Sequence, residues 1–120
     1  MDTLKEIYPD RDNEVSFKVV SYDESGVKSN VDLSGVSRVI LIVENGYNGS
    51  NATLDSNTIG SSFFAVTSDG DLTLYPQGVT LDDGEYRCKL IIYDALHTNG
   101  QYLAHPDTRS RLTVRVKNDS

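Results

Sequence analysis

The sequence predicts an all-β fold, an antiparallel sandwich of two sheets with about seven to nine strands. Apolar and polar residues alternate in segments 14–20, 84–93 and 111–116, and a period of two is typical of strands with one buried face. Residues 38–43 are almost continuously apolar, as expected for a strand that is covered on both faces. Turn residues recur between these segments at the short intervals typical of a sandwich.

The remaining strands follow in chain order, separated by turn residues. Segments 61–66 and 71–75 form two shorter strands, and Asp69–Gly70 marks a tight turn between them. Asn99–Gly100 marks a second hairpin after segment 84–93. The residues expected to face the core are Val15, Phe17, Val19, Tyr86, Cys88, Leu90, Ile92, Leu112, Val114 and Val116.

The first residues are expected to lie outside this sandwich. Leu4, Ile7 and Tyr8 fall at helical spacing, which predicts a short helix. A helix of this length is marginal in water by itself. We therefore expect residues 1–12 to form an N-terminal docking arm, either frayed or ordered against a neighbouring chain, and residues 13–118 to form the sandwich domain.

The stretch before and within segment 84–93 reads Asp-x-Gly-x-Tyr-x-Cys, with Asp82, Gly84, Tyr86 and Cys88 in those places. This pattern resembles the sixth strand of an immunoglobulin domain and implies an Ig-like sandwich. We expect Gly84 to allow a sharp corner and Asp82 to accept hydrogen bonds in the turn. The Tyr86 hydroxyl should reach an upstream backbone group. The chain has no tryptophan, so the resemblance is to a more distant Ig-like sandwich.

Cys88 is the only cysteine, so the sandwich has no inter-sheet disulfide. Its place on the inward face of a strand predicts a buried free thiol. The N-terminus has neither the basic nor the apolar region of a secretory signal. These features favour folding in a reducing cytoplasm, unless a signal has already been removed.

Charge and motifs argue against catalysis and against nucleic acid or membrane as the partner. The net charge of -7 disfavours contact with a phosphate backbone or an anionic membrane, and the longest apolar run, residues 39–43, is too short to span a bilayer. The sequence contains no nucleophile, phosphate-binding or metal motif. His97 and His105 flank Asn99–Gly100 but would not face each other in a two-residue hairpin, so we expect no metal, no other cofactor and no enzyme activity.

Residues 46–60 form a long polar connection between strands. Loops of this length are usually functional or mobile. The candidate binding residues of this segment are Tyr47, Asn48, Asn51 and Asp55. Tyrosine and asparagine are residue types that binding loops favour, and Asp55 adds a carboxylate. Two interpretations stay open, a recognition loop and a plain solvated connection.

A last pattern is the order of elements over residues 14–117. An apolar first strand precedes VDLSGV (31–36), DGDLTL (69–74), a Gly-x-Tyr strand and a closing RLTVRV (111–116). This order resembles the small, cysteine-poor sandwiches of tailed-bacteriophage virions, which serve as capsid decoration proteins and as tail or baseplate modules. The resemblance gives no site residues.

This resemblance implies a non-enzymatic structural virion protein, first of all a capsid decoration protein held by protein–protein contacts. Its partner would be the major capsid protein or another virion protein, with a homo-oligomer as a further option, and it would be assembled in the host cytoplasm. The alternatives are a tail or baseplate component, and a recognition module that binds a glycan or a cell-surface protein through residues 46–60.

Overall fold

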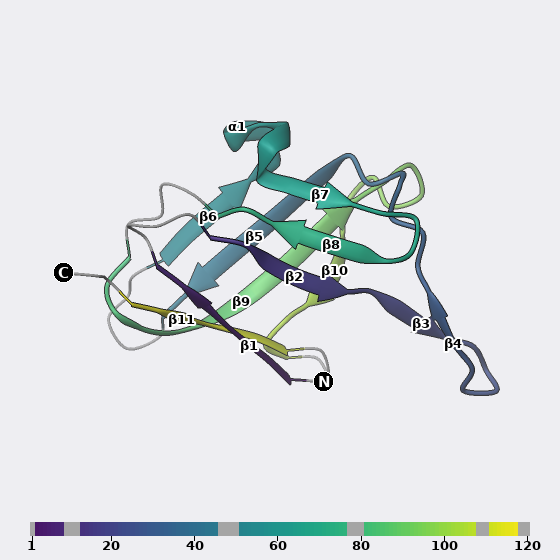
Figure 1. Cartoon of the computed structure of the whole chain (residues 1–120), viewed down its shortest axis with the longest axis horizontal. Coiled ribbons are helices and arrows are strands. Elements are labelled where there is room, and N and C mark those ends of the chain that lie inside the picture. Colours follow the sequence, from purple (N-terminus) through teal and green to yellow (C-terminus); the bar gives the residue numbers. More distant parts are fainter. Residues whose placement is uncertain (1, 9–12, 46–50, 77–80, 108–110, 118–120) are drawn as a thin grey trace.

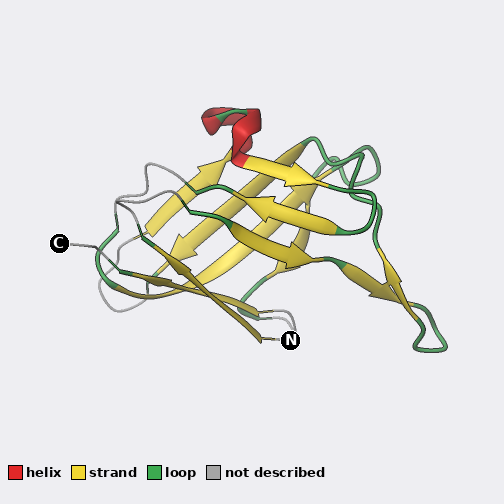
Figure 2. Ribbon diagram, viewed as in Figure 1, coloured by secondary structure: helices red, strands yellow, loops and turns green. Residues whose placement is uncertain are grey.

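The computed structural model describes residues 2–8, 13–45, 51–76, 81–107 and 111–117 and confirms an all-β, Ig-like sandwich (Figure 1; Figure 2). Its strands are β1 (Asp2–Ile7), β2 (Val15–Lys18), β3 (Val20–Tyr22), β4 (Lys28–Asn30), β5 (Arg38–Glu44), β6 (Asn51–Asp55), β7 (Phe64–Val66), β8 (Asp71–Leu74), β9 (Gly84–Tyr93), β10 (Gln101–Ala104) and β11 (Arg111–Val116). Two short helical turns, α1 (Ser56–Ile59) and η1 (Ser61–Phe63), lie between β6 and β7.

Two sheets pack against each other across the core. The larger has the strand order β1-β11-β9-β5-β6, with β10 also pairing with β9, and the smaller has the order β2-β8-β7. Immunoglobulin domains group their strands in the same way, with C, F and G in one sheet and B, E and D in the other. β3 and β4 form a separate hairpin, which extends beyond the end of the sandwich (Figure 1).

The described residues form eleven strands, more than predicted, because two long strands are interrupted. Val19 separates β2 from β3; its N–H donates to the carbonyl oxygen of Gly70 (2.8 Å), and its own carbonyl accepts from the N–H of Val31 (3.1 Å). β10 and β11 follow one another along the same edge of β9, where β11 pairs with residues 84–88 and β10 with residues 90–92.

The core lies between the sheets and contains the residues that the alternating pattern places inward. Val15, Tyr86, Cys88, Leu90, Ile92, Leu112, Val114 and Val116 are buried, and Phe17 and Val19 are half-buried. Burying one large apolar side chain contributes about 1.5–3 kcal/mol relative to leaving it exposed. Apolar packing therefore stabilises this sandwich, whereas antibody domains also have a disulfide between their sheets.

The N-terminal segment is a strand, and the short helix predicted from its spacing is wrong. β1 runs parallel to β11, from Asp2 opposite Arg111 to Ile7 opposite Val116. A helix of this length would have few internal hydrogen bonds, whereas the edge of β11 offers a partner position for each residue of β1. Pairing with β11 therefore gives this segment more backbone partners than a short helix would. The β1–β11 pair is parallel, whereas the other described pairs of this sheet are antiparallel.

The docking arm expected at residues 1–12 is thus attached to the larger sheet along residues 2–7. Ile7 is completely buried, whereas Leu4 is 52% exposed and Tyr8 is half-buried. The N–H of Lys117 continues the pairing by donating to the carbonyl oxygen of Ile7 (3.0 Å). Residues 2–7 are therefore part of the sandwich and not an arm outside it.

Much of the connection predicted at residues 46–60 is regular structure. Residues 51–55 form β6, which pairs with β5 along its whole length, and α1 follows directly. Leu54 is buried in the core and Ala52 packs against it half-buried, so two inward apolar residues hold this polar segment as an edge strand. Tyr47 and Asn48 lie outside the described residues.

Asp55 has a structural role at the junction of β6 and α1. Its carboxylate accepts a hydrogen bond from the N–H of Asn57 (3.0 Å), which caps the helix, and accepts two more from the guanidinium of Arg38. The hydrogen bonds from Arg38 hold the pKa of Asp55 below its ordinary value. Asp55 is therefore largely engaged within its own chain.

Both predicted hairpins are present, but the second has a longer connection. Asp69–Gly70 lies in the turn between β7 and β8. β9 and β10 pair antiparallel, yet residues 94–100 connect them in place of a two-residue turn. The carboxylate of Asp94 closes the first part of this connection by accepting from the N–H groups of Leu96 (3.0 Å) and His97 (2.8 Å).

Candidate functional site

The Asp-x-Gly-x-Tyr-x-Cys stretch forms a tyrosine corner. The hydroxyl of Tyr86 donates a hydrogen bond to the backbone carbonyl oxygen of Asp82 (2.6 Å). Gly84 lies between them with φ of 150°, a conformation that residues with a Cβ rarely adopt. The group of Asp82 that takes part is its backbone carbonyl and not its side chain. The motif therefore fixes the start of β9.

Replacing Tyr86 with phenylalanine should lower the free energy of unfolding by about 1 kcal/mol, because it removes one hydrogen bond and keeps the ring in the core. Tyr93→Phe is the matched control. The ring centroid of Tyr93 lies 4.9 Å from the guanidinium carbon of Arg38, a contact that does not need the hydroxyl. Urea denaturation should show a loss for the first change only; equal losses would contradict a stabilising corner.

Cys88 is a free, fully buried thiol on the inward face of β9. Its Sγ donates weakly to the carbonyl oxygen of Tyr86 (3.7 Å). Burial raises the pKa of the Cys88 thiol to about 12. Because the thiolate is the nucleophilic form of cysteine, this residue is a packing element and not a reactive group.

Cys88 should react slowly with Ellman's reagent in the folded protein and quickly in denaturant, at about pH 8. The native rate then reports opening of the sandwich and not the chemistry of an exposed thiol. Following the released thiolate by absorbance in both conditions gives the ratio of rates. Fast labelling of the native protein would contradict the inward register of β9.

The titratable groups of the described residues do not form a metal-binding cluster. Within that part of the chain, no group of three or more His, Cys, Asp or Glu side chains could hold a metal ion. Nδ1 of His97 lies 2.8 Å from the carboxylate of Asp94, and Nδ1 of His105 accepts from the N–H of Asp107 (3.0 Å). Among the helices described, none is long and apolar enough to cross a membrane.

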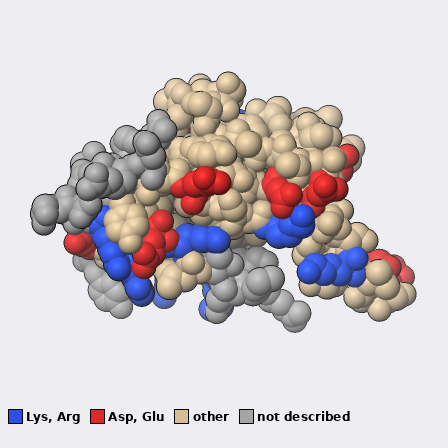
Figure 3. Space-filling model, viewed as in Figure 1, with Lys and Arg blue, Asp and Glu red and all other residues tan. Residues whose placement is uncertain are grey.

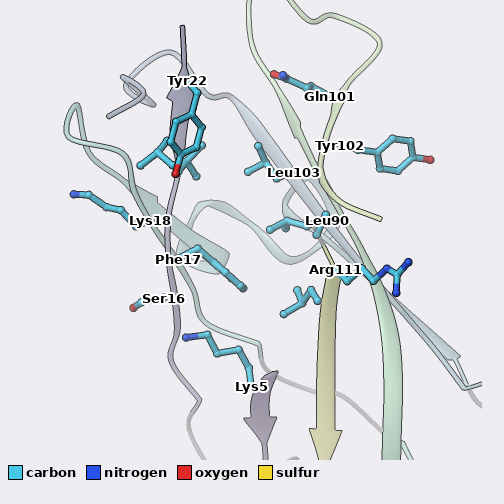
Figure 4. A pocket seen from close by; sticks show the side chains of 14 residues that line it. Lys5, Ser16, Phe17, Lys18, Tyr22, Leu90, Gln101, Tyr102, Leu103 and Arg111 are labelled. Carbon is cyan, nitrogen blue, oxygen red and sulfur yellow. The ribbon is translucent and has the colours of Figure 1, made fainter. Parts of the chain in front are cut away.

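A groove of about 750 Å³ opens where β2 and β3 of one layer face β10 of the other (Figure 4). Phe17 and Leu103 point into it from opposite walls, with Leu90 between them, whereas Tyr102 and Arg111 point away at the far rim. Its lining residues are Lys5, Ser16, Phe17, Lys18, Val19, Val20, Tyr22, Leu90, Gln101, Tyr102, Leu103, Ala104, Arg111 and Leu112.

The groove combines apolar walls with a basic rim. Among the described residues, its lining includes Lys5, Lys18 and Arg111 but no aspartate, glutamate, histidine or cysteine. The ammonium of Lys5 lies 5.6 Å from the centre of the Phe17 ring, and the ammonium of Lys18 lies 3.1 Å from a carboxylate oxygen of Asp71. A lining without carboxylate, imidazole or thiol is suited to binding and poorly suited to proton transfer near neutral pH.

This basic rim is a local feature. On the face drawn in Figure 3, acidic and basic side chains are intermixed over the surface, and the chain as a whole carries a net charge of -7. The described lining of the groove is therefore basic although the chain as a whole is acidic.

The β3–β4 hairpin continues one wall of the groove outward. Its strands are almost entirely exposed, with Tyr22 at 63% and Val27 at 57%. The carboxylate of Asp23 orders the turn by accepting from the N–H groups of Ser25 (2.8 Å) and Val27 (2.9 Å). An isolated two-stranded hairpin is marginally stable in water, so an ordered one with apolar tips is suited to contact with another surface.

The structure separates the two sites predicted from the sequence. Of the docking-arm residues, Leu4 and Ile7 belong to β1, at one edge of the larger sheet, and Tyr8 follows it directly. Asn51 and Asp55 belong to β6, at the opposite edge. Only β1 reaches the groove, through Lys5. The sequence analysis missed the groove because its two walls, β2–β3 and β10, are far apart in the chain and meet only through packing of the sheets.

Comparisons with known proteins show no family for this chain. No family model matches it, and no curated protein matches it. One solved structure with similarity is SGBP-B of the Bacteroides ovatus mixed-linkage glucan utilization locus, in complex with a mixed-linkage heptasaccharide. The two share 11% identity at a TM-score of 0.39, over 98% of this chain and 23% of the other. The chain thus spans about a quarter of that protein, and this likeness carries no argument about function.

Proposed function

We propose that this chain is a non-enzymatic structural protein of a viral particle, first of all a capsid decoration protein that docks through protein–protein contacts. The observation that carries the docking role is the exposed apolar surface around the groove, where Tyr22 is 63% exposed and Tyr102 53%. Exposed apolar surface next to a groove is typical of interaction sites. The viral setting is supported by the order of elements along the sequence.

The proposed partner is the major capsid protein or another virion protein, met in the host cytoplasm during assembly. A stable contact of standard size buries about 800 Å² on each partner. The groove is lined by residues of β2, β3 and β10, and together with the adjoining β3–β4 hairpin it offers a surface for such a contact. A tail or baseplate position would use the same surface with a different partner.

Copy number on purified particles tests this proposal. Particles from the source that makes this chain are purified on a density gradient, and the chain is counted against the major capsid protein by quantitative mass spectrometry. A decoration protein should be present in a high copy number that matches the capsid symmetry. A few copies per particle would indicate a tail or baseplate component, and absence from particles would overturn the virion role.

A second candidate is recognition of a glycan or a cell-surface protein. The observation that favours it is the pair of exposed tyrosines, Tyr22 and Tyr102, beside the groove, because tyrosine combines an apolar ring with a polar hydroxyl. In this form the groove, and not residues 46–60, is the binding site. The isolated domain should then bind defined glycans or cells on an array. Loss of binding in Tyr22→Ala would locate the binding site at the groove.

A further inference from the structure

The outer edge of β10 is open in the part of the chain that the structure describes. β5 pairs with one edge of β9, so β11 and β10 must share the other edge. β1 covers the outer edge of β11 only as far as Asp2, which lies opposite Arg111. Beyond that point, no described strand pairs with the outer side of Gln101–Ala104. An open edge presents N–H and C=O groups that can pair with another chain.

The groove lies directly beside this open edge. Leu103 of β10 points into the groove and faces Phe17 of β2, while Tyr102 points to the other side (Figure 4). A strand placed next to β10 would therefore have one face toward apolar walls and the other toward solvent. The volume of about 750 Å³ leaves room for several side chains of such a strand.

The charges around the groove select the kind of segment. In the described part of the chain, Lys5, Lys18 and Arg111 line it and no aspartate or glutamate does. Lys18 forms an ion pair with Asp71. Lys5 has no carboxylate partner in the described residues and contacts the ring of Phe17. A segment with carboxylates next to Lys5 would gain attraction without displacing an existing ion pair.

We propose that this groove receives an extended acidic segment of a partner protein, which adds to β10 as a further strand of the larger sheet, in line with β1. The inference deepens the proposed docking function and rests on it. In strand addition, main-chain hydrogen bonds supply affinity and alternate side chains supply specificity. Apolar side chains of the segment enter between Phe17 and Leu103, and its carboxylates lie near Lys5.

A second copy of this chain fits the groove less well. Of the other edge strands of the larger sheet, β6 brings one carboxylate, that of Asp55, which is already hydrogen-bonded by Arg38. β1 (DTLKEI) is acidic at Asp2 and Glu6, and the carboxylate of Glu6 is already engaged by the Tyr8 hydroxyl (2.8 Å) and the ammonium of Lys117 (3.5 Å). An edge strand of the smaller sheet, β7, has the sequence FAV and brings no carboxylate. A different protein with an acidic, extended segment is therefore the better partner.

The probe is a blocked synthetic peptide of about nine residues that alternates glutamate and valine, long enough to form one strand. Titrated into the labelled domain, it should shift the backbone amide resonances of Gln101–Ala104 and slow their hydrogen exchange. A matched peptide that alternates lysine and valine should do so far more weakly. Equal binding of the two peptides, or shifts confined to β6 or β7, would overturn strand addition at β10.

Lys5→Glu should weaken binding of the acidic peptide by roughly tenfold, because it places a like charge at the rim. Arg87→Glu is the matched control, since Arg87 lies on β9, is exposed and does not line the groove; it should leave peptide affinity unchanged. Thermal unfolding of both variants checks that they fold. Equal peptide affinities for the two variants would contradict a role for the basic rim.

The same variants separate this inference from the proposed function. Loss of Lys5→Glu from particles that retain Arg87→Glu supports both. If particles retain Lys5→Glu at full occupancy, docking uses another surface and the strand-addition inference fails alone. If the wild-type chain is absent from particles yet binds the acidic peptide at β10, the virion role fails and strand addition stands.

Discussion

Replacing Ile7 with alanine should lower the free energy of unfolding by about 2–5 kcal/mol, the usual loss when a large buried aliphatic side chain is truncated. Ile7 is completely buried at the end of β1 and pairs with Val116. Its side chain belongs to the same apolar cluster as Leu112 and Val114 of the neighbouring strand. Truncation would leave a cavity where the first and last strands of the domain meet.

Leu4→Ala is the matched control, because Leu4 lies on the same strand but is 52% exposed. Surface changes of this kind usually stay within about 0.5 kcal/mol. Urea denaturation of the two variants should therefore differ several-fold in effect. If Ile7→Ala were as mild as Leu4→Ala, β1 would not be anchored in the core and the segment would behave as a free arm.

The sequence alone predicts the opposite result for this segment. Leu4, Ile7 and Tyr8 have helical spacing, and that spacing places them on one face of a helix that the sandwich does not need. Whether this segment forms a helix or a strand is decided at the other end of the chain, where the edge of β11 is available for pairing. Local periodicity cannot report a pairing between residues 2–7 and 111–116, so a short segment with an ambiguous pattern is the place where sequence reasoning fails.

Longer strands were predictable because their pattern repeats. In β9 the inward residues Tyr86, Cys88, Leu90 and Ile92 are all buried, and each alternation adds support for the same register. The corner before β9 was also predictable, since a glycine and a tyrosine at fixed spacing imply a specific turn. The register of a long strand and the type of a turn depend on residues that are close in the sequence, and a local sequence pattern can therefore predict them.

The edge strand β6 and the groove depend on distant neighbours. Asn51–Asp55 is polar enough to be taken for a loop, and only its pairing with β5 and the burial of Leu54 make it a strand. The groove needs β2 and β10 to face each other across the two sheets. Its cations, such as Lys5 and Lys18, look like ordinary outward residues of two separate strands, and nothing in the sequence brings them together.

Gly70→Ala should be the second strongly destabilising change, with a loss of about 2–4 kcal/mol from backbone strain and steric overlap together. Gly70 has φ of 89°, and a Cβ there would lie 2.5 Å from the carbonyl oxygen of Val19. That oxygen accepts the N–H of Val31, and the carbonyl of Gly70 accepts the N–H of Val19. Relieving the overlap would therefore stretch the backbone bonds that hold the junction of β2 and β3.

Gly26→Ala separates the effect of backbone strain from that of steric overlap. Gly26 has a similar φ of 82°, but a Cβ there would meet nothing within 4 Å, so this variant should lose only the strain of a left-handed conformation, about 1–2 kcal/mol. Chemical denaturation of both variants measures the difference. Because Val19 leads directly into the hairpin wall of the groove, Gly70→Ala should also speed amide exchange in β3. Equal losses for the two glycines would mean that the close approach of Gly70 to Val19 does not constrain this junction.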